Sequence, residues 1–444
     1  MYHIGIDIGT SSICGVAHNR ETGDCEYITK ENDAALSSSF KEEKIQDPAK
    51  ILEHVADIIN QFTSRHKDIS GIGLAGQMHG IVYVDGNGDT VSPLFTWQDG
   101  RGNRLYRVEQ TYADYLNSKS DYQVATGYGL VTHFYNSVNG LVPSNASKLC
   151  TIMDYVAMKL TGRTTPLTDY SNAAALGFFN KRTLCFDYDV LQEIGLNVDV
   201  LPETGPAPSL IGYHKNIPVY AAIGDNQAAF IGAVVEREHA VHITVGTSSQ
   251  ISVYSSDYVE VDGLETRPLP GGGYLLVGAE LCGGYAFSLL KKFFAETIRF
   301  ICGTQVTDDD IYSAMMSISS IKSDGELCVS TLFNGTRLNP DERGCITGIS
   351  VSNFLPQELV KGFARGICDA LYSYYVLLPE EIKKSKTHIV ASGNGFRKNH
   401  LIREAFADRF GLPVVFSSCL EEAAFGASQI PAASISFKNS SLMN

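Results

Sequence analysis

The chain has 444 residues, enough for two or three domains, with 44% apolar and 19% charged residues as in ordinary globular proteins. A formal net charge of −14 argues against a nonspecific nucleic-acid binder, and the lack of a run of about 18 apolar residues argues against a membrane span. The ten cysteines are scattered without a C-x-x-C pair, which indicates neither a zinc site nor a disulfide framework. With no basic leader before residue 9, we expect a cytoplasmic protein.

The first part of the chain reads as an α/β unit. Residues 3–8, 12–18 and 25–29 are predicted strands, joined by turns at Gly9-Thr10 and at residues 21–24. A helix follows, with Asp47 at its N-cap and Pro48 at its first position, and its apolar residues recur at one-face spacing as far as Phe62. A strand at 69–74 then leads into the loop 76–80. Strand, helix and strand in this order are typical of an α/β domain.

The second part repeats the opening pattern. Residues 240–245 and 250–254 are predicted strands around a Gly246-Thr247 turn, followed by a helix at 356–377, a strand at 388–391 and a helix at 398–410. The charged stretch 236–239 separates two apolar runs. We therefore expect two α/β domains, 1–238 and 239–444.

The two Gly-Thr turns are candidate phosphate loops. A tight turn without bulky side chains directs backbone N–H groups at phosphate oxygens, and hydroxyls such as those of Thr10, Ser11 and Ser12 add donors. One such turn is usually a plain hairpin; two in matching positions leave both interpretations open. Asp7, just before the first turn, is a candidate to hold Mg²⁺ through water.

Two further features admit a structural and a functional interpretation. Asp225 is the only charged residue between Lys215 and Glu236, so it is either a helix N-cap or a carboxylate kept for function, and the two roles are compatible. The cluster Ser392-Gly393-Asn394-Gly395 is either a strand-to-helix turn or a close backbone approach to a nucleotide.

The segments 76–80 and 96–101 combine polar groups with the only tryptophan, Trp97. Such a mixture suits a sugar, which stacks an apolar face on an aromatic ring and hydrogen-bonds through its hydroxyls. On periodicity alone, the interpretation of His79 and Trp97 as satisfied core residues is favoured.

Together these segments resemble a known family. Gly5-Ile6-Asp7-Ile8-Gly9-Thr10, Gly76-Gln77-Met78-His79-Gly80, Trp97-Gln98-Asp99-Gly100-Arg101, Gly224-Asp225 and Gly246-Thr247 occur in the order typical of FGGY carbohydrate kinases. The resemblance runs from Tyr2 to about Ser428. It implies an α/β fold of two actin-like (ribonuclease H-like) ATPase domains, with the active site in the cleft between them.

The resemblance also implies roles for single residues. Asp7 matches the family's metal-associated aspartate, and Asp225 its general base, so that ATP and Mg²⁺ are expected. The sugar would contact Met78, His79, Trp97, His133 and Asp225. ATP would contact Thr10, Ser11, Ser12, Gly246, Thr247, Gly284, Gly393 and Asn394.

The substrate is expected to be a ketose. Met78-His79 argues against glycerol kinase, whose corresponding pair is typically Arg-Glu. Residues 96–101, 125–129, 154–157 and 171–180 look more like members that phosphorylate sedoheptulose than like those that phosphorylate D-xylulose. D-xylulose remains the alternative, as does, from another class, an actin-like nucleotide-binding structural or switch protein. We expect a small-molecule sugar partner and neither nucleic acid nor membrane. The oligomeric state stays open, a homodimer included.

Two features depart from the family pattern. Asn394 stands where many relatives have glycine, although asparagine tolerates left-handed backbone better than most residues. A polar tail, 434–444, is expected where relatives usually continue their last helix.

Overall fold

The computed structural model describes residues 1–322, 327–336, 339, 341–417 and 419–440. The chain forms two compact units. Unit 1 contains residues 1–232, 267–273 and 419–444, and unit 2 contains residues 233–266 and 274–418. Within the described ranges, no helix has the length and apolar character needed to cross a membrane.

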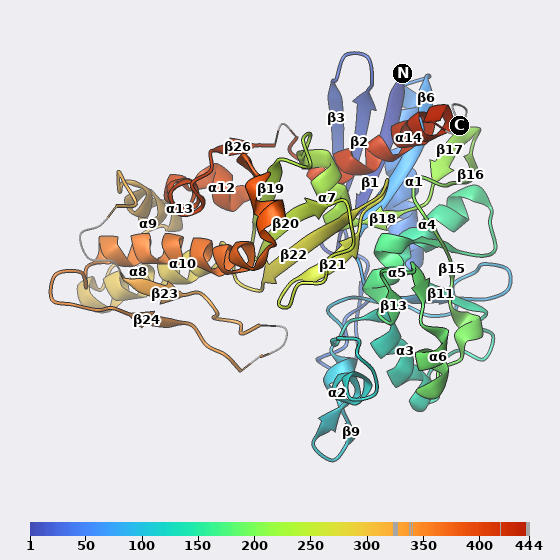
Figure 1. Ribbon diagram of the computed structural model, residues 1–444, viewed down its shortest axis with the longest axis horizontal. Helices are drawn as coiled ribbons and strands as arrows, with labels where there is room; N and C mark the ends of the chain where they lie inside the picture. The colour runs from blue at the N-terminus through green and yellow to red at the C-terminus, as the bar shows by residue number, and fades with distance from the viewer. Residues whose placement is uncertain (323–326, 337–338, 340, 418, 441–444) are drawn as a thin grey trace. The chain divides into compact units, whose positions relative to one another are not determined.

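Unit 1 is built on one mixed sheet (Figure 1). Strands β1 (Tyr2–Ile8), β2 (Ser12–Asn19) and β3 (Cys25–Glu31) form an antiparallel meander, as predicted. Strand β6 (Ile69–Gly76) runs parallel to β1, and both β17 (Ile217–Tyr220) and β18 (Ile223–Gly224) run parallel to β6. β16 (Leu210–His214) lies at the edge. The ends of β1, β6 and β18 therefore lie side by side.

Helix α1 (Pro48–Arg65) confirms the predicted helix and its cap. The Asp47 carboxylate accepts hydrogen bonds from the backbone N–H groups of Ala49 and Lys50, and Pro48 occupies the first turn. The apolar stripe from Ile51 to Phe62 is fully buried with the strands of the sheet in one core. The remaining helices of the first 232 residues are α2 (Tyr112–Asn117), α3 (Gly129–Val138), α4 (Ile152–Thr161), α5 (Tyr170–Leu176), α6 (Tyr188–Glu193) and α7 (Asp225–Ala233).

Unit 2 repeats the strand order of unit 1, which confirms the repeat predicted from the sequence. β19 (Ala240–Val245), β20 (Ser249–Ser255) and β22 (Tyr274–Glu280) form an antiparallel meander. β25 (His388–Ser392) then pairs parallel to β19, and β26 (Val414–Phe416) parallel to β25. β21 (Glu265–Pro268) lies beside β22 at the edge.

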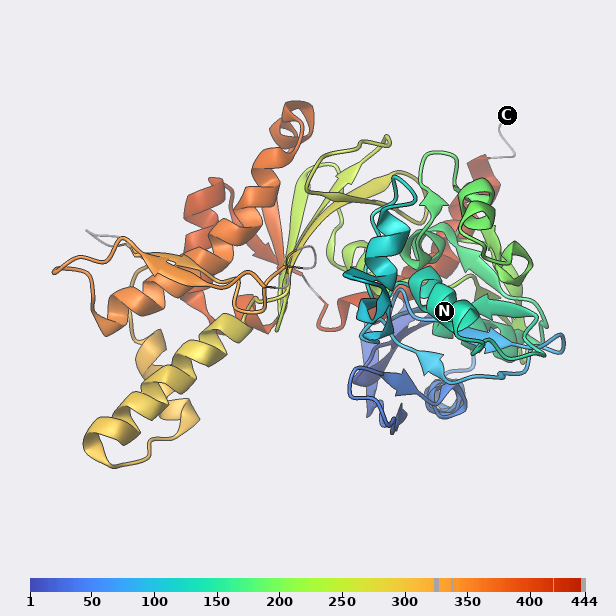
Figure 2. The same cartoon turned by 90° about the horizontal axis from the view of Figure 1, so that it is seen from below.

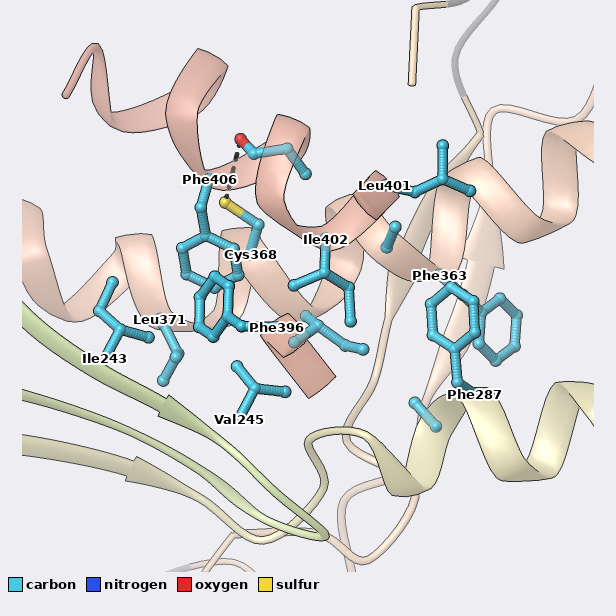
Figure 3. Close-up of a cluster of buried hydrophobic side chains, with 14 of the residues drawn as sticks. Ile243, Val245, Phe287, Phe363, Cys368, Leu371, Phe396, Leu401, Ile402 and Phe406 are labelled. Carbon is cyan, nitrogen blue, oxygen red and sulfur yellow. Dashed lines mark hydrogen bonds between the residues drawn. The ribbon is translucent and has the colours of Figure 1, made fainter. Parts of the chain in front are cut away.

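The helices of unit 2 lie beside its sheet (Figure 2), and helices and sheet share one apolar core. α10 (Pro356–Leu377) has the predicted bounds and contacts β20, β22, α8 (Tyr285–Cys302) and α13 (His400–Phe410). Figure 3 shows this core, in which Ile243 and Val245 of β19 lie among side chains from α8, α10, α12 (Asn394–Lys398) and α13. Cys368 on α10 reaches the carbonyl oxygen of Ala405, with 3.5 Å between sulfur and oxygen.

The C-terminal helix differs from two expectations, the contiguous domain 239–444 and the polar tail 434–444. α14 (Glu422–Ser440) packs against β1 and β6 of unit 1, so unit 1 is not one contiguous stretch. Residues 434–440, expected in a polar tail, continue this helix. The close approach depends on glycine, because a Cβ at Gly5 or Gly73 would lie 1.9 Å from a backbone oxygen of α14.

Candidate active site

Two carboxylates emerge from the same end of the unit 1 sheet. In the strand register, Asp7 of β1 and Ile223 of β18 both pair with Ala75 of β6. Asp225 follows β18 directly as the first residue of α7. The parallel strands therefore bring together two aspartates that are 218 positions apart in the printed sequence.

Asp7 carries a buried oxygen, Oδ1, that has no hydrogen-bond partner. Burial, together with the negative charges of Asp225 and Glu421, raises the pKa of Asp7 to about 7. An uncompensated carboxylate among other carboxylates is a suitable environment for a divalent cation. In the described part of the chain, no group of three His, Cys, Asp or Glu side chains could hold a metal ion. Mg²⁺ usually keeps several waters and needs only one or two carboxylates beside substrate phosphates, so Asp7 fits it.

Asp225 is the first residue of α7. Its carboxylate Oδ1 accepts a hydrogen bond of 2.7 Å from the backbone N–H of Asn226. Burial raises the pKa of Asp225 to about 6, whereas the Asn226 N–H and the positive charge of Arg267 act in the opposite direction. The carboxylate is therefore more basic than a solvated aspartate and is still ionised near neutral pH.

Met78 and His79 occupy the loop that follows β6. Met78 is buried against Gly224, since a Cβ at Gly224 would lie 2.6 Å from the Met78 sulfur. His79 has a φ of 73°, and its Nδ1 lies 2.7 Å from the carbonyl oxygen of Ala175. Its ring centre is 4.5 Å from that of Tyr128. Met78 thus neighbours the strand that precedes Asp225, and His79 is 7% exposed with its Nδ1 engaged.

Trp97 is not a core residue, because 38% of its surface is exposed. Its indole Nε1 donates a hydrogen bond of 2.9 Å to the hydroxyl oxygen of Thr10. One residue of the predicted sugar site and one of the predicted phosphate loop are therefore in direct contact. An exposed indole face anchored at its N–H suits stacking against a sugar ring.

His133 on α3 is 3% exposed. Its Nδ1 lies 2.8 Å from the Tyr83 hydroxyl, its Nε2 is buried without a hydrogen-bond partner, and burial lowers its pKa to about 4. His133 is therefore a neutral imidazole, and its contact with a sugar stays a prediction.

The first Gly-Thr turn is held by amide side chains from other elements. Asn32 donates to the carbonyl oxygen of Gly9 at 2.8 Å, and Gln46 donates to that of Thr10 at 2.9 Å. Gln77 in turn donates to the Gln46 side chain at 2.9 Å and accepts from the Thr10 hydroxyl at 3.3 Å. The residues Ser11 and Ser12 are exposed beyond this network.

The second Gly-Thr turn packs on the N-terminus of α8 in unit 2. The backbone N–H of Gly284 donates to the Gly246 oxygen at 2.7 Å, and that of Gly283 to the Thr247 oxygen at 2.8 Å. Thr247 itself is exposed. The structure therefore brings the predicted nucleotide residues Gly246, Thr247 and Gly284 together at a helix N-terminus, where backbone N–H groups favour anions.

Gly393 joins the same group, whereas Asn394 does not take the left-handed backbone considered for it in the sequence, and its contact with ATP stays a prediction. A Cβ at Gly393 would lie 2.5 Å from the carbonyl oxygen of Val245, the residue before the second turn. The positive φ of 87° belongs to Gly393, and Asn394 is the first residue of α12. Asn394 therefore needs no left-handed backbone, and its replacement of glycine leaves the turn intact.

Several residues that shape the site were missed by the sequence analysis. Arg267 is 6% exposed and donates to the Asn226 side chain at 3.1 Å, beside Asp225. Asn32 and Gln46, which hold the first turn, are also buried. No local pattern singles out these three residues, because each contact joins segments that are distant in the sequence.

A cavity of about 720 Å³ in unit 2 contains none of the predicted residues. It lies at α10 and α13 and is lined by both cations and carboxylates, among them Lys361, Arg365, Asp369 and Arg409. Arg409 is paired with Asp369 at 2.9 Å. This cavity is separate from the clusters described above.

Two family models match the chain almost end to end. The N-terminal domain of the FGGY family of carbohydrate kinases matches residues 2–232, and its C-terminal domain matches residues 241–434. A sedoheptulokinase from Mus musculus is 28% identical over 96% of this chain and 96% of its own length. A xylulose kinase from Staphylococcus xylosus is 25% identical over 97% of this chain and 90% of its own.

A solved structure supports the fold independently. A ligand-bound xylulose kinase from Lactobacillus acidophilus superimposes with a TM-score of 0.82 at 21% identity, covering 98% of this chain and 90% of that one. The predicted α/β fold with two actin-like domains is confirmed.

Proposed function

The chain belongs to the FGGY family of carbohydrate kinases and is an ATP-dependent sugar phosphotransferase, and on that premise we propose that it phosphorylates a terminal hydroxyl of sedoheptulose with Asp225 as general base. The observation that carries the proposal is the setting of Asp225. Its side chain is half-buried, its pKa is raised to about 6, and it directly follows Gly224, which lies against Met78. A general base works best when its pKa lies near the operating pH.

The reaction requires little covalent chemistry from the protein. The sugar hydroxyl oxygen forms a bond to the γ-phosphorus while the bond from that phosphorus to the bridging oxygen breaks, and ADP leaves with the bonding electrons. Asp225 accepts the hydroxyl proton as the oxygen attacks. Trp97 and Met78 orient the sugar, and His79 shapes the loop between them. Positioning of this kind supplies much of the rate enhancement in phosphoryl transfer.

The phosphates are assigned to the two Gly-Thr turns and their neighbours. In unit 2, the exposed Thr247 offers its hydroxyl as a donor to phosphate oxygens, and the dipole of α8 favours negative charge at its N-terminus. In unit 1, the exposed hydroxyls of Ser11 and Ser12 do the same. Asp7 would hold Mg²⁺ through water, and the bound ion neutralises charge on the phosphates.

Sedoheptulose is proposed over D-xylulose because the mouse relative, named sedoheptulokinase, covers almost all of both chains. The likeness to a xylulose kinase of S. xylosus makes D-xylulose the second candidate. Scattered cysteines without a C-x-x-C pair support a cytoplasmic, reducing setting.

The substrate is tested by measuring ADP release from Mg·ATP with sedoheptulose, D-xylulose, D-ribulose, fructose and glycerol. We expect the highest kcat/KM with sedoheptulose. A preference for D-xylulose would reject the substrate and keep the chemistry. Equal ADP release without any sugar would reject sugar phosphorylation as the main activity.

The base is tested by Asp225→Asn, which preserves size but cannot accept the proton. We expect kcat to fall by about 10²–10⁴-fold. Asp187→Asn is the matched control, since Asp187 also accepts a backbone N–H at the start of a helix, α6, yet lies outside the site. An Asp225→Asn enzyme that keeps more than about a tenth of wild-type kcat would contradict the role.

A further inference from the structure

The two-residue strand that directly precedes Asp225, β18, is held from α5 by two neighbouring side chains. The Ser171 hydroxyl oxygen accepts a hydrogen bond of 3.2 Å from the backbone N–H of Gly224. The Asn172 side-chain amide donates to the carbonyl oxygen of Ala222 at 3.1 Å. The two contacts lie at either end of the segment 222–224, immediately before Asp225.

Ser171 is itself fixed in orientation by a buried carboxylate. Its hydroxyl donates to Oδ1 of Asp169 at 2.5 Å, so its single proton is committed and a lone pair faces Gly224. Asp169 also accepts the backbone N–H of Ser171 at 2.9 Å and that of Ala207 at 2.6 Å. The three hydrogen bonds that Asp169 accepts therefore fix the direction in which the Ser171 hydroxyl oxygen accepts the N–H of Gly224.

These groups are shielded from water. Asp169, Ser171 and Asn172 are each at most 2% exposed. On its other side, β18 has only the pairings of Ile223 and Gly224 with β6. Two paired residues are a short strand, so we expect its position to depend on what holds it from outside the sheet. The α5 side chains supply that support.

We propose that Ser171 and Asn172 are positioning residues that set the place of the Asp225 carboxylate relative to the sugar hydroxyl. The inference rests on the proposed role of Asp225 as general base. A displacement of about 1 Å in a reacting group can cost about 10²-fold in rate. Loosening the backbone before Asp225 should therefore reduce turnover without touching nucleotide binding.

The test is the kinetics of Ser171→Ala, with Asn172→Ala as a second variant at the other contact. For each we expect kcat with the preferred sugar to fall about 10-fold, while KM for Mg·ATP changes less than about twofold. Thr151→Ala is the matched control, because the fully buried Thr151 donates to another buried carboxylate, Asp154, away from β18. It should lose stability and keep its kcat.

A double-mutant cycle separates positioning from a general loss of structure. In an Asp225→Asn background, Ser171→Ala should lower the residual kcat by less than about twofold, because the group being positioned no longer acts. An equal loss in both backgrounds, an unchanged kcat in both single variants, or an equal loss in Thr151→Ala overturns the inference and leaves Asp225 as base. Full activity of Asp225→Asn alone overturns the proposed base, and the positioning role with it.

Discussion

The two Gly-Thr turns share a backbone pattern but differ in charge. Counting back three residues from the threonine, the first hairpin has Asp7 and the second has Thr244. Asp7 pairs with Cys14 across its hairpin, and Thr244 pairs with Gln250 across the other. A repeated supersecondary structure thus offers a carboxylate in unit 1 and only neutral groups in unit 2. The proposed cation contact in unit 1 therefore has no charged counterpart at the matching position of the second hairpin.

The turns also differ in what holds their carbonyl groups. In unit 1 the carbonyl oxygens of the turn accept hydrogen bonds from the side-chain amides of Asn32 and Gln46. In unit 2 they are bound by backbone N–H groups of Gly283 and Gly284. The first turn is therefore sensitive to changes of distant side chains, whereas the second is sensitive to any added side chain at the helix N-terminus.

Among changes to the two hairpins, the largest expected effect comes from removing the charge of Asp7. Asp7→Asn should lower kcat by about 10²-fold, since it removes the group proposed to hold the cation at the phosphates. Thr244→Val in the second hairpin should change kcat by less than about threefold, because Thr244 offers no charge to a cation. Steady-state assays over a range of Mg²⁺ measure both. Equal losses in the two variants would show that the hairpins contribute alike.

A second prediction concerns a feature that the hairpins share, one buried histidine in each first strand. Burial lowers the pKa of His3 and of His242 to about 4, below the unfolded value of about 6.5. The unfolded chain therefore binds more protons between these values, and the free energy of unfolding falls as the pH drops from about 6.5 to 4.

His3→Gln and His242→Gln should each reduce this acid-linked loss by about 1–3 kcal/mol. Urea unfolding of each variant and the wild type at pH 7 and pH 4.5 gives the difference. A loss that is as steep in both variants as in the wild type would mean that neither histidine carries the acid sensitivity.

The third prediction concerns the second Gly-Thr turn, whose carbonyl oxygens accept hydrogen bonds from backbone N–H groups. A Cβ at Gly283 would lie 2.4 Å from the carbonyl oxygen of Ser248, so Gly283→Ala must move the turn from the α8 N-terminus. We expect KM for Mg·ATP to rise about 10-fold, corresponding to about 1.4 kcal/mol. Gly86→Ala is the control, because its Cβ would meet no atom within 4 Å. Unchanged ATP affinity in Gly283→Ala would separate this turn from nucleotide binding.

The smallest effect, on the free energy of unfolding, is expected at the first Gly-Thr turn, whose carbonyl oxygens accept hydrogen bonds from side-chain amides. Gln46→Ala removes the donor to the Thr10 oxygen and the acceptor of the Gln77 amide. We expect a loss of about 1–2 kcal/mol in the free energy of unfolding, because buried polar groups lose their partners. Chemical denaturation measures it. Gln61→Ala, at a half-buried position of α1 outside the buried stripe, should stay within about 0.5 kcal/mol of the wild type.

Local sequence determined most of the secondary structure and the identity of the family. The apolar spacing with Asp47 and Pro48 specified α1, and the Gly-Thr turns specified both hairpins, because capping and turn chemistry act over a few residues. The same short motifs identified Asp7, Met78, Trp97 and Asp225 as candidates. Asp7, Met78 and Asp225 are grouped by the parallel register of β1, β6 and β18, and Trp97 joins them through its hydrogen bond to Thr10.

Only the tertiary structure decided which distant groups complete each cluster. Arg267 reaches Asn226 from a segment 41 residues away, and α14 returns from the end of the chain to β1. The hydrogen bond from the Gly224 N–H to Ser171 likewise joins residues 53 positions apart. Such contacts leave no periodic signal in the sequence, because they depend on how separate elements pack and on which buried polar groups must find partners.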